Sequence, residues 1–557
     1  MEPYKQLYYN ILIYRTPHKN ICLAALAACS VTACDLDTAP TTSLEANAVF
    51  KNLENADRVI RGSWNYIFNS GSTYASIGYG AIMINDDFAG SDVVRTTSYG
   101  YSSSYNLTNG YGRGEINDVM WDMVYDPINN CNAVIKNIDG ISGDQTEKNR
   151  IKGQAYATRG FLYMLLASHY SFAIDKDPDA VCVPIYTEPT DYDMATTGKP
   201  AASVSEVYEQ ALNDLKWGYD LIPEDYNRGS NATDQYKIDH TVVTGLRARA
   251  SLYARKWEDA YKYADEAMKL KNSYLMSEAE YKSGFNNALN KEWMWGYSCT
   301  LDDNLPAYNF YYKDTTTPGG GYTNFNTDPY FKELFDKNDY RRDLFKWGLN
   351  TGYGECAMLN YKFLFADINN MLGDVIMMRV AEMYLIKAEA AAHISGKTGE
   401  AQTLLKELRD ARMKEGFESP AVTATGDELL KEIWLERRKE LWGEGFSLTD
   451  IIRNQQSVER KKFEKYAMAD ITHDSKGQEI RTPKLDENGD VILAPEDASD
   501  EYKEKNCMLI SGHPTLKFPD GSDFEVNSKY YLFRITEKEE LQNKNLYNDH
   551  PKLSIYR

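Results

Sequence analysis

The fold of this 557-residue chain is decided by the stretch Arg379-Val-Ala-Glu-Met-Tyr-Leu-Ile-Lys-Ala-Glu-Ala390. Its apolar residues recur largely at spacings of three and four, with charged residues between them, which predicts an amphipathic helix. Glycines then interrupt the pattern, and the segment 400–412 repeats it with Ala401, Leu405 and Leu408. The two helices should return antiparallel. Neither can bury its apolar face alone, so this region requires helical neighbours.

Further helices are predicted on both sides of this hairpin. A third helix follows Thr425, a capping residue, and turns Leu429 and Ile433 inward. Upstream, the segments 241–254 and 258–269 form a second hairpin, with alanines at the offsets found in 400–412. Small side chains at this spacing let helices approach closely, as in a tetratricopeptide unit. We identify two such helix pairs in the sequence and expect the chain to contain four.

The rest of the chain fits a mainly α fold with irregular inserts. Pro127 should end or kink one of the remaining helices. The sequence predicts those helices at 52–68, 116–138, 151–170 and 204–219, and short strands at 293–297 and 530–534.

Three linked motifs give this chain a family resemblance. They are Arg379-x-x-Glu382-x-Tyr384-Leu385-x-x-Ala388-Glu389-Ala390, then Glu436-Arg437-x-x-Glu440-Leu441-x-x-Glu444-Gly445, then Asp450-Ile-Ile-Arg453. In this order they resemble the C-terminal signature of the SusD/RagB outer-membrane lipoproteins of Bacteroidetes. One departure is Ser447, where many members carry Arg. The resemblance implies a SusD-like, tetratricopeptide-like helical-hairpin scaffold: an N-terminal region at 34–290 with a loop insert at 71–114, and a C-terminal region at 291–557 that completes the same compact unit.

The amino terminus has the features of a lipoprotein signal peptide. Lys19 precedes a short apolar run at 21–28, and Val31-Thr-Ala-Cys34 resembles a bacterial lipobox. Residues 1–33 would then be removed and Cys34 acylated; the alternative is an ordinary signal peptide that ends near a cysteine. The following Asp35-Leu-Asp37 resembles the acidic tag that sends such lipoproteins to the outer face of the outer membrane.

The net charge, the cysteine spacing and the motifs that are missing from the sequence argue against several classes of function. A formal net charge of -20 argues against nucleic-acid partners. The cysteines left after residue 34 are odd in number and widely spaced, so neither a zinc site nor a complete disulfide framework is indicated. Phosphate-binding, dinucleotide-binding, zinc-protease and nucleophile-elbow motifs do not occur, and no cofactor or metal is expected. Adjacent Asp86 and Asp87 on an extended segment would face opposite ways, and His169 should be a packed residue.

Two blocks rich in Tyr and Gly, at 71–114 and 292–341, are the candidate ligand surface. The chain has 42 Tyr, against 19 Phe and 9 Trp, and most of them should fill helix interfaces. Tyrosine combines a flat apolar face with a hydroxyl, which suits a hydroxylated ligand. For stacking we predict Tyr99, Tyr101, Tyr105, Tyr297, Tyr308, Tyr311, Tyr312 and Tyr322, and for polar contacts Asp87, Arg95, Asn106 and Asn309.

The resemblance implies a surface glycan-binding lipoprotein without enzymatic activity. Its ligand would be an oligosaccharide or polysaccharide, and its partner a SusC-like TonB-dependent outer-membrane transporter on which it acts as a lid. Two other classes stay open. A tetratricopeptide-type scaffold would bind peptides or proteins through its helices, and a glycoside hydrolase would need converging carboxylates.

Overall fold

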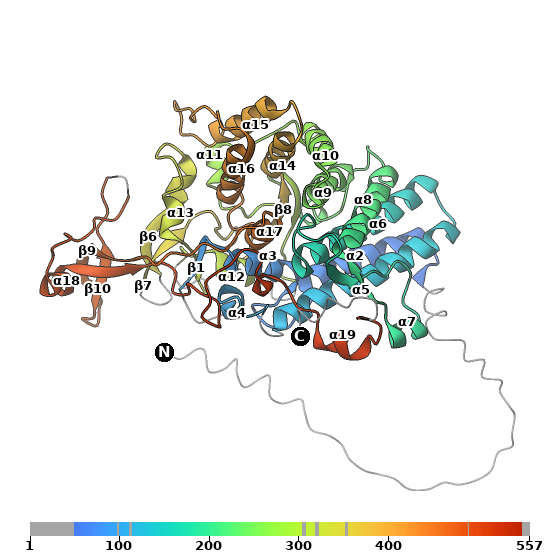
Figure 1. Cartoon of the computed structure of the whole chain (residues 1–557), viewed down its shortest axis with the longest axis horizontal. Coiled ribbons are helices and arrows are strands. Elements are labelled where there is room, and N and C mark those ends of the chain that lie inside the picture. The colour runs from blue at the N-terminus through green and yellow to red at the C-terminus, as the bar shows by residue number, and fades with distance from the viewer. Residues whose placement is uncertain are drawn as a thin grey trace, which may run out of the picture. The chain divides into compact units, whose positions relative to one another are not determined.

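The computed structural model describes residues 49–96, 100–110, 114–303, 308–317, 322–350, 355–487 and 489–547. The predicted signal region 1–33, Cys34 and Tyr99 lie outside these ranges. Residues 46–557 form one compact unit. The described part contains eighteen α-helices and eleven short strands (Figure 1). The mainly α fold class is therefore confirmed.

Long helices of the N-terminal half form one packed layer. They are α2 (Leu53–Asn69), α5 (Glu115–Asn137), α6 (Gln145–Tyr170) and α8 (Val204–Leu221). The α6 helix packs against both α5 and α8, and nearly its whole second half is buried. Polar caps set the helix starts, as where Asn52 accepts a hydrogen bond from the Asn55 amide at 2.8 Å. Pro127 lies inside α5, which does not end there.

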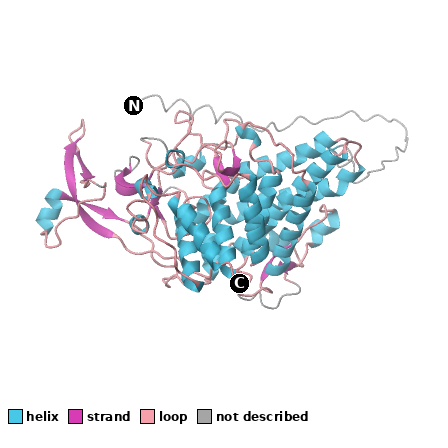
Figure 2. Cartoon of the chain, turned by 90° about the horizontal axis from the view of Figure 1, so that it is seen from above, coloured by secondary structure: helices cyan, strands magenta, loops and turns pink. Residues whose placement is uncertain are grey.

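Helical hairpins continue the scaffold into the C-terminal half. The helices α9 (His240–Tyr253) and α10 (Trp257–Leu270) form one pair, and α14 (Val380–His393) and α15 (Thr398–Asp410) form the next. The α10 helix packs against both α9 and α14, so the two pairs share an interface. Figure 2 shows the helices of the chain packed beside one another. Both hairpins predicted from the sequence are present, and the tetratricopeptide-like scaffold is confirmed.

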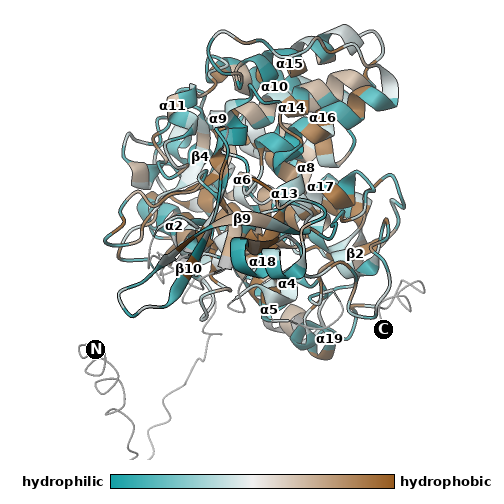
Figure 3. Cartoon of the chain, turned by 90° about the vertical axis from the view of Figure 1, so that its left-hand side faces the viewer, coloured by the Kyte–Doolittle hydropathy of each residue, from teal (hydrophilic) through white to brown (hydrophobic). Residues whose placement is uncertain are grey.

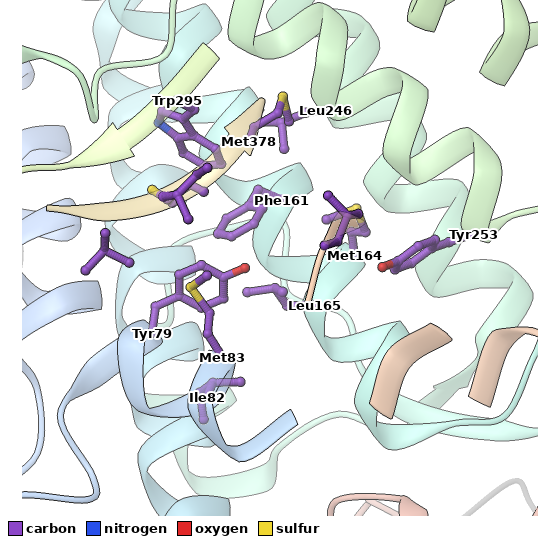
Figure 4. Close-up of a cluster of buried hydrophobic side chains, with 14 of the residues drawn as sticks. Tyr79, Ile82, Met83, Phe161, Met164, Leu165, Leu246, Tyr253, Trp295 and Met378 are labelled. Atoms are coloured by element: carbon purple, nitrogen blue, oxygen red, sulfur yellow. The ribbon is translucent and has the colours of Figure 1, made fainter. Parts of the chain in front are cut away.

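Aromatic and sulfur-containing side chains fill the centre of the unit (Figure 4). The Trp295 ring lies 5.1 Å from the Trp64 ring and 5.2 Å from the Phe161 ring, in edge-to-face contacts. Trp295 belongs to β4 (Trp293–Tyr297), which pairs antiparallel with β8 (Val375–Arg379). The strand predicted at 293–297 is confirmed, and it anchors the second Tyr-rich block to the core.

Four of the signature residues quoted above, Arg379, Glu436, Glu440 and Glu444, belong to a buried ion network. Its members are Glu292, Asp339, Arg341, Lys362, Arg379, Arg412, Glu436, Glu440 and Glu444, all buried. Arg379 contacts Glu292 and Glu444 at 2.8 Å each, and Glu440 accepts from Arg412 at 2.8 Å and from Arg341 at 2.6 Å. The network ties α16 (Gly426–Glu440) to β4 and β8. The motifs that carry the family resemblance therefore stabilise the scaffold.

Two sequence-based expectations about local structure were wrong. The block 71–114 contains the fully buried helix α3 (Gly78–Phe88), so Asp86 and Asp87 lie on a helix and not on an extended segment. The expected strand at 530–534 is replaced by a 3-10 turn at Lys529–Tyr531, where the Ser528 side chain accepts from the Tyr530 amide. In both places the apolar run is too short for its periodicity to separate helix from strand.

The remaining elements are short. They are β1 (Val93–Arg95), α4 (Ser102–Tyr105), β2 (Val181–Pro184), α7 (Tyr192–Thr197), β3 (Ala201–Ser203), α11 (Glu278–Tyr281), α12 (Tyr308–Lys313), β5 (Phe325–Thr327), α13 (Pro329–Lys332), β6 (Phe345–Asn350), β7 (Glu355–Asn360), α17 (Ser447–Arg453), β9 (Glu464–His473), β10 (Glu479–Pro483), α18 (Asp500–Asn506), β11 (Cys507–Ser511) and α19 (Glu537–Gln542). The strands β10, β9 and β11 form an antiparallel sheet that carries α18 (Figure 3).

The described ranges contain neither a candidate membrane span nor a candidate metal cluster. No helix of the described chain combines the length and the apolar character needed to cross a bilayer. Nor do the described residues contain a group of three or more His, Cys, Asp or Glu side chains placed to hold a metal ion. The five cysteines at 131, 182, 299, 356 and 507 are free thiols.

Candidate functional site

The two Tyr-rich blocks, 71–114 and 292–341, meet in space although they are far apart in the sequence. The strand β1 of the first block pairs antiparallel with β5 of the second, with Val94 opposite Asn326 and Arg95 opposite Phe325. The Asp328 amide extends the contact by donating to the Asp92 carbonyl at 3.0 Å. Figure 1 shows β1, α4 and α12 side by side. The two blocks that were predicted to form one surface therefore lie together in the structure.

Six tyrosines of the two blocks gather at this junction, and we call them the tyrosine cluster: Tyr74, Tyr101, Tyr297, Tyr311, Tyr312 and Tyr322. The Tyr322 ring is central, with its centroid 5.3 Å from that of Tyr311, 5.0 Å from that of Tyr312 and 6.0 Å from that of Tyr74. Tyr101 contacts the Tyr312 ring edge-on at 4.8 Å. These spacings are those of favourable aromatic pairs, so the rings support one another.

Half of the cluster offers no open ring face. Tyr101, Tyr297 and Tyr312 are buried. The Tyr297 ring is stacked on Phe68 at 3.8 Å, and Gly100 lies directly against the Tyr312 ring. A ligand cannot stack on these three rings in this arrangement. Their contribution is to support the rings above them.

The accessible rings are those of Tyr74, Tyr311 and Tyr322. Tyr74 is 46% exposed, and the other two are half-buried. Tyr311 and Tyr312 differ because α12 is a short helix, which turns adjacent side chains about 100° apart. Tyr74 was not among the residues predicted from the sequence. Its position in the first Tyr-rich block was the available signal.

Asn309 supplies an unpaired amide beside the cluster. Both polar atoms of its side chain are buried and have no hydrogen-bond partner among the described residues. It lines a cavity of about 40 Å³ together with Tyr74, Tyr101 and Tyr297. At the same cavity the Tyr297 hydroxyl donates to Asp303 at 2.6 Å. A space of this size holds about one water molecule or ligand hydroxyl, so Asn309 is placed to orient a hydroxyl group.

Two of the other predicted polar contacts are already engaged. Asn106 accepts a hydrogen bond from Thr515 at 2.7 Å. The half-buried Arg95 donates through Nε to the Gly100 carbonyl at 3.0 Å, and burial lowers its pKa. The Arg95 contact holds Gly100, which lies against the Tyr312 ring. These two side chains therefore act on the protein's own backbone and side chains in this arrangement.

Of the other tyrosines predicted to stack, one is buried and two cannot be placed from the described side chains. Tyr105 is buried, with its hydroxyl 2.7 Å from His513 Nδ1, so its ring also presents no face to a ligand. Tyr308 begins α12, and its side chain lies outside the described part. Tyr99 lies outside the described residues altogether.

The paired carboxylates of α3 are structural. Asp86 contacts His169 Nε2 at 3.0 Å; burial alone would lower the pKa of His169, but this carboxylate raises it overall. Asp87 accepts from the Gly445 amide at 2.9 Å. Burial raises the pKa of Asp87 above its usual range, against the opposing charge of Lys313. His169 is a packed residue, as predicted, and Asp87 does not line the small cavity of the tyrosine cluster.

Two family models match this chain. The model described as SusD family matches residues 257–551. The model described as starch-binding associating with outer membrane matches residues 72–243. Together the matches include both Tyr-rich blocks, all three motifs and the ion network.

Solved structures and curated proteins give the same picture. A SusD-like carbohydrate binding protein from Bacteroides vulgatus is 47% identical, with a TM-score of 0.80, over 91% of this chain and 100% of that one. A SusD superfamily protein from Bacteroides thetaiotaomicron is 25% identical, with a TM-score of 0.62, over 74% of this chain and 90% of that one. SusD-like protein P2 of Formosa agariphila is 23% identical over 76% of this chain and 86% of its own length.

Proposed function

Because this chain belongs to the SusD family, we propose that it binds carbohydrate at the cell surface and passes oligosaccharides to a SusC-like TonB-dependent transporter. The ligand is captured at the tyrosine cluster, with Tyr74, Tyr311 and Tyr322 stacking on sugar rings and Asn309 orienting a hydroxyl. The protein acts by binding and performs no bond-breaking step.

One observation carries this proposal: the β1–β5 pairing holds accessible rings from two distant blocks within 6.0 Å of one another, next to a buried unpaired amide. Sugar rings have apolar faces and polar edges. Adjacent aromatic faces with a polar group beside them match both features of such a ligand. The 47% identical relative described as carbohydrate binding supports the same ligand class.

The partner and the location complete the proposal. Acylation at Cys34 tethers the chain to the outer membrane, facing the cell exterior, and the protein covers the transporter as a lid. The family model described as associating with outer membrane supports this location. Bound oligosaccharide then stays close to the transport path while the lid is closed.

The experiment is affinity gel electrophoresis of the purified protein against a panel of plant and host polysaccharides. We expect at least one polysaccharide to retard the wild type, and the Tyr74→Ala/Tyr322→Ala double variant to lose about tenfold or more in affinity. Each aromatic contact contributes about 0.5–1.5 kcal/mol, so the loss of two rings is measurable. Isothermal titration with fragments of the retarding polysaccharide gives the affinity directly.

Tyr466→Ala is the matched control, because Tyr466 is 43% exposed but lies on β9, outside the cluster. It should retain full affinity. Equal losses in both variants, or retention of binding in the double variant, would contradict the assignment of the site. Release of reducing ends during incubation would favour the glycoside hydrolase alternative instead.

A further inference from the structure

A second cavity lies apart from the tyrosine cluster. Its volume is about 430 Å³, within the range of small-molecule sites. It is enclosed by α16, α17, the segment 454–459 and the residues just before β1. Exposed side chains, among them Lys431, Glu459 and Val526, stand at its mouth. No member of the tyrosine cluster lines it.

Arg437 forms the base of this cavity. Its side chain is only 1% exposed, and Nε donates to Asp450 at 2.7 Å. Both terminal nitrogens, Nη1 and Nη2, are buried and have no hydrogen-bond partner among the described residues. The guanidinium carbon lies 4.8 Å from the centre of the Phe446 ring, which fixes the plane of the group. Buried charged donors are costly when no acceptor meets them.

Two further polar atoms in the wall are also unmatched within the described chain. They are the indole Nε1 of Trp434, a donor, and Oδ1 of the buried Asn454, an acceptor. Leu435 and Ile451 contribute apolar side chains to the lining. The cavity lining therefore combines the two terminal nitrogens of the Arg437 guanidinium, the indole donor of Trp434, the acceptor oxygen of Asn454 and an apolar side.

The charges of the wall select the kind of ligand. Asp92 and Asp450 line the cavity but are paired with Arg438 and Arg453 at 2.6 Å each. Glu459 at the mouth adds a negative charge and Lys431 a positive one, and the buried Asp87 also lines the cavity. These carboxylates disfavour a multiply charged anion such as phosphate. The planar fork of an arginine matches the two oxygens of a carboxylate.

We propose that this cavity binds a small hydroxylated monocarboxylate, of which a uronic acid is the carbohydrate example. Its carboxylate accepts from Nη1 and Nη2 of Arg437, a hydroxyl accepts from Trp434, and another hydroxyl donates to Asn454. The apolar face of the sugar ring lies against Leu435 and Ile451. This site does not depend on ligand capture at the tyrosine cluster.

The test is isothermal titration of the purified chain with glucuronate and galacturonate, using glucose, acetate and inorganic phosphate as comparison ligands. We expect the uronates to bind at least about tenfold more tightly than glucose or phosphate. Acetate should be weaker than the uronates, because it lacks the ring and the hydroxyls. Equal binding of glucose, tighter binding of phosphate, or no uronate binding at millimolar concentrations would overturn the proposal.

Variants locate the binding. Trp434→Phe removes one N–H and keeps the ring, and Asn454→Asp places a fixed negative charge in the cavity. Both should weaken uronate binding severalfold or more, whereas Trp217→Phe on α8 should not. Tyr74→Ala should also leave uronate affinity unchanged, which separates this site from the tyrosine cluster. Thermal melts confirm that each variant is folded. Unchanged affinity in both Trp434→Phe and Asn454→Asp would overturn the proposal.

Discussion

Asp328 is a buried carboxyl close to a second carboxyl. It is 4% exposed, and its Oδ1 has no hydrogen-bond partner among the described residues. Burial, reinforced by the negative charge of Asp92, raises the pKa of Asp328 to about 7. In the unfolded chain the same group has a pKa near 4. The folded protein therefore holds a proton on Asp328 at pH values where the unfolded chain has released it.

This difference predicts how stability depends on pH. Between about pH 4 and 7 unfolding releases the Asp328 proton, so this group's contribution to the free energy of unfolding falls as pH rises through that window. Asp328→Asn removes the titration and keeps the shape of the neutral form. At pH 7.5 we expect the variant to be more stable than wild type by on the order of 1 to 3 kcal/mol.

Urea unfolding at pH 5 and at pH 7.5 measures the effect. The advantage of Asp328→Asn should be small at pH 5 and larger at pH 7.5. An exposed aspartate such as Asp523, changed to Asn, is the control and should show no such difference. A variant less stable than wild type at pH 7.5 would show that the Asp328 carboxylate makes a favourable contact when ionised.

At the scale of elements, α16 has two faces with different roles. One face carries Glu436 and Glu440, which lie in the buried ion network with Arg341, Arg379 and Arg412. Side chains elsewhere on the helix, including Trp434 and Arg437, line the second cavity. A single helix therefore holds the scaffold together and also shapes a potential ligand site.

The network makes a prediction for stability. Glu440→Gln keeps the shape but removes the charge that meets Arg341, Arg379 and Arg412 in a buried site. Loss of one partner of a buried ion pair typically costs about 3–5 kcal/mol, because the remaining charge stays unpaired. We expect a loss of this order in chemical unfolding. Glu440→Gln should also lower the melting temperature.

Glu432→Gln is the matched control on the same helix. Glu432 is partly exposed and forms an ion pair with Arg409 at 2.8 Å. Exposed pairs contribute about 0–1 kcal/mol, so this variant should remain close to wild type. Similar small losses in both variants would mean that the network relaxes around the missing charge.

One departure from the family pattern also lies on an element of this region. Ser447 begins α17 and lines the second cavity. A serine side chain is much shorter than the arginine that many relatives carry at this position, so it leaves room in the wall. The departure noted in the sequence thus coincides with the space that we assign to a carboxylate ligand.

At the scale of the whole molecule, the site depends on contacts between distant parts of the chain. The stacked helix pairs hold β4 and β8 in the core, and the β1–β5 pairing joins the two Tyr-rich blocks above them. The proposed binding surface is therefore assembled by the scaffold, and no single segment contains it. Isolated peptides from either block should not bind sugar.

Attachment to the membrane is a prediction for the whole protein. Cys34→Ala should abolish incorporation of an alkyne-labelled palmitate and release the protein from the outer-membrane fraction of cells that express it. A fatty chain contributes about 0.8 kcal/mol per buried CH₂, so its loss is decisive for anchoring. Cys299→Ala, which removes another cysteine, should stay labelled and membrane-bound. Continued labelling of Cys34→Ala would place the lipid elsewhere.

Helix positions could be predicted from the sequence because they depend on local spacing. The segments 52–68 and 204–219 correspond closely to α2 and α8, and the strand at 293–297 matches β4. Short apolar runs carried less information. The run in α3 was not recognised as a helix, because burial on all sides removes the polar–apolar alternation that marks an amphipathic helix.

The site could be predicted only at the level of blocks. Four tyrosines that were predicted to stack on the ligand are buried: Tyr101, Tyr105, Tyr297 and Tyr312. Tyr74, which composition did not single out, is the most exposed ring of the cluster that the structure describes. The exposure of a side chain depends on which distant segment covers it. The amino-acid composition of a block does not determine that segment.

The sequence by itself determined the family, the helical scaffold and the two Tyr-rich blocks to which we assign the proposed binding surface. Hydrophobic periodicity and motif spacing depend on residues close together in the chain, so they can be read directly from the sequence. Only the tertiary structure decided which rings remain accessible, that four motif residues join one ion network, and that Arg437 lines a cavity while its terminal nitrogens have no hydrogen-bond partner among the described residues. These properties arise from packing between segments far apart in the chain, where small differences in chain path decide whether a side chain is covered or open.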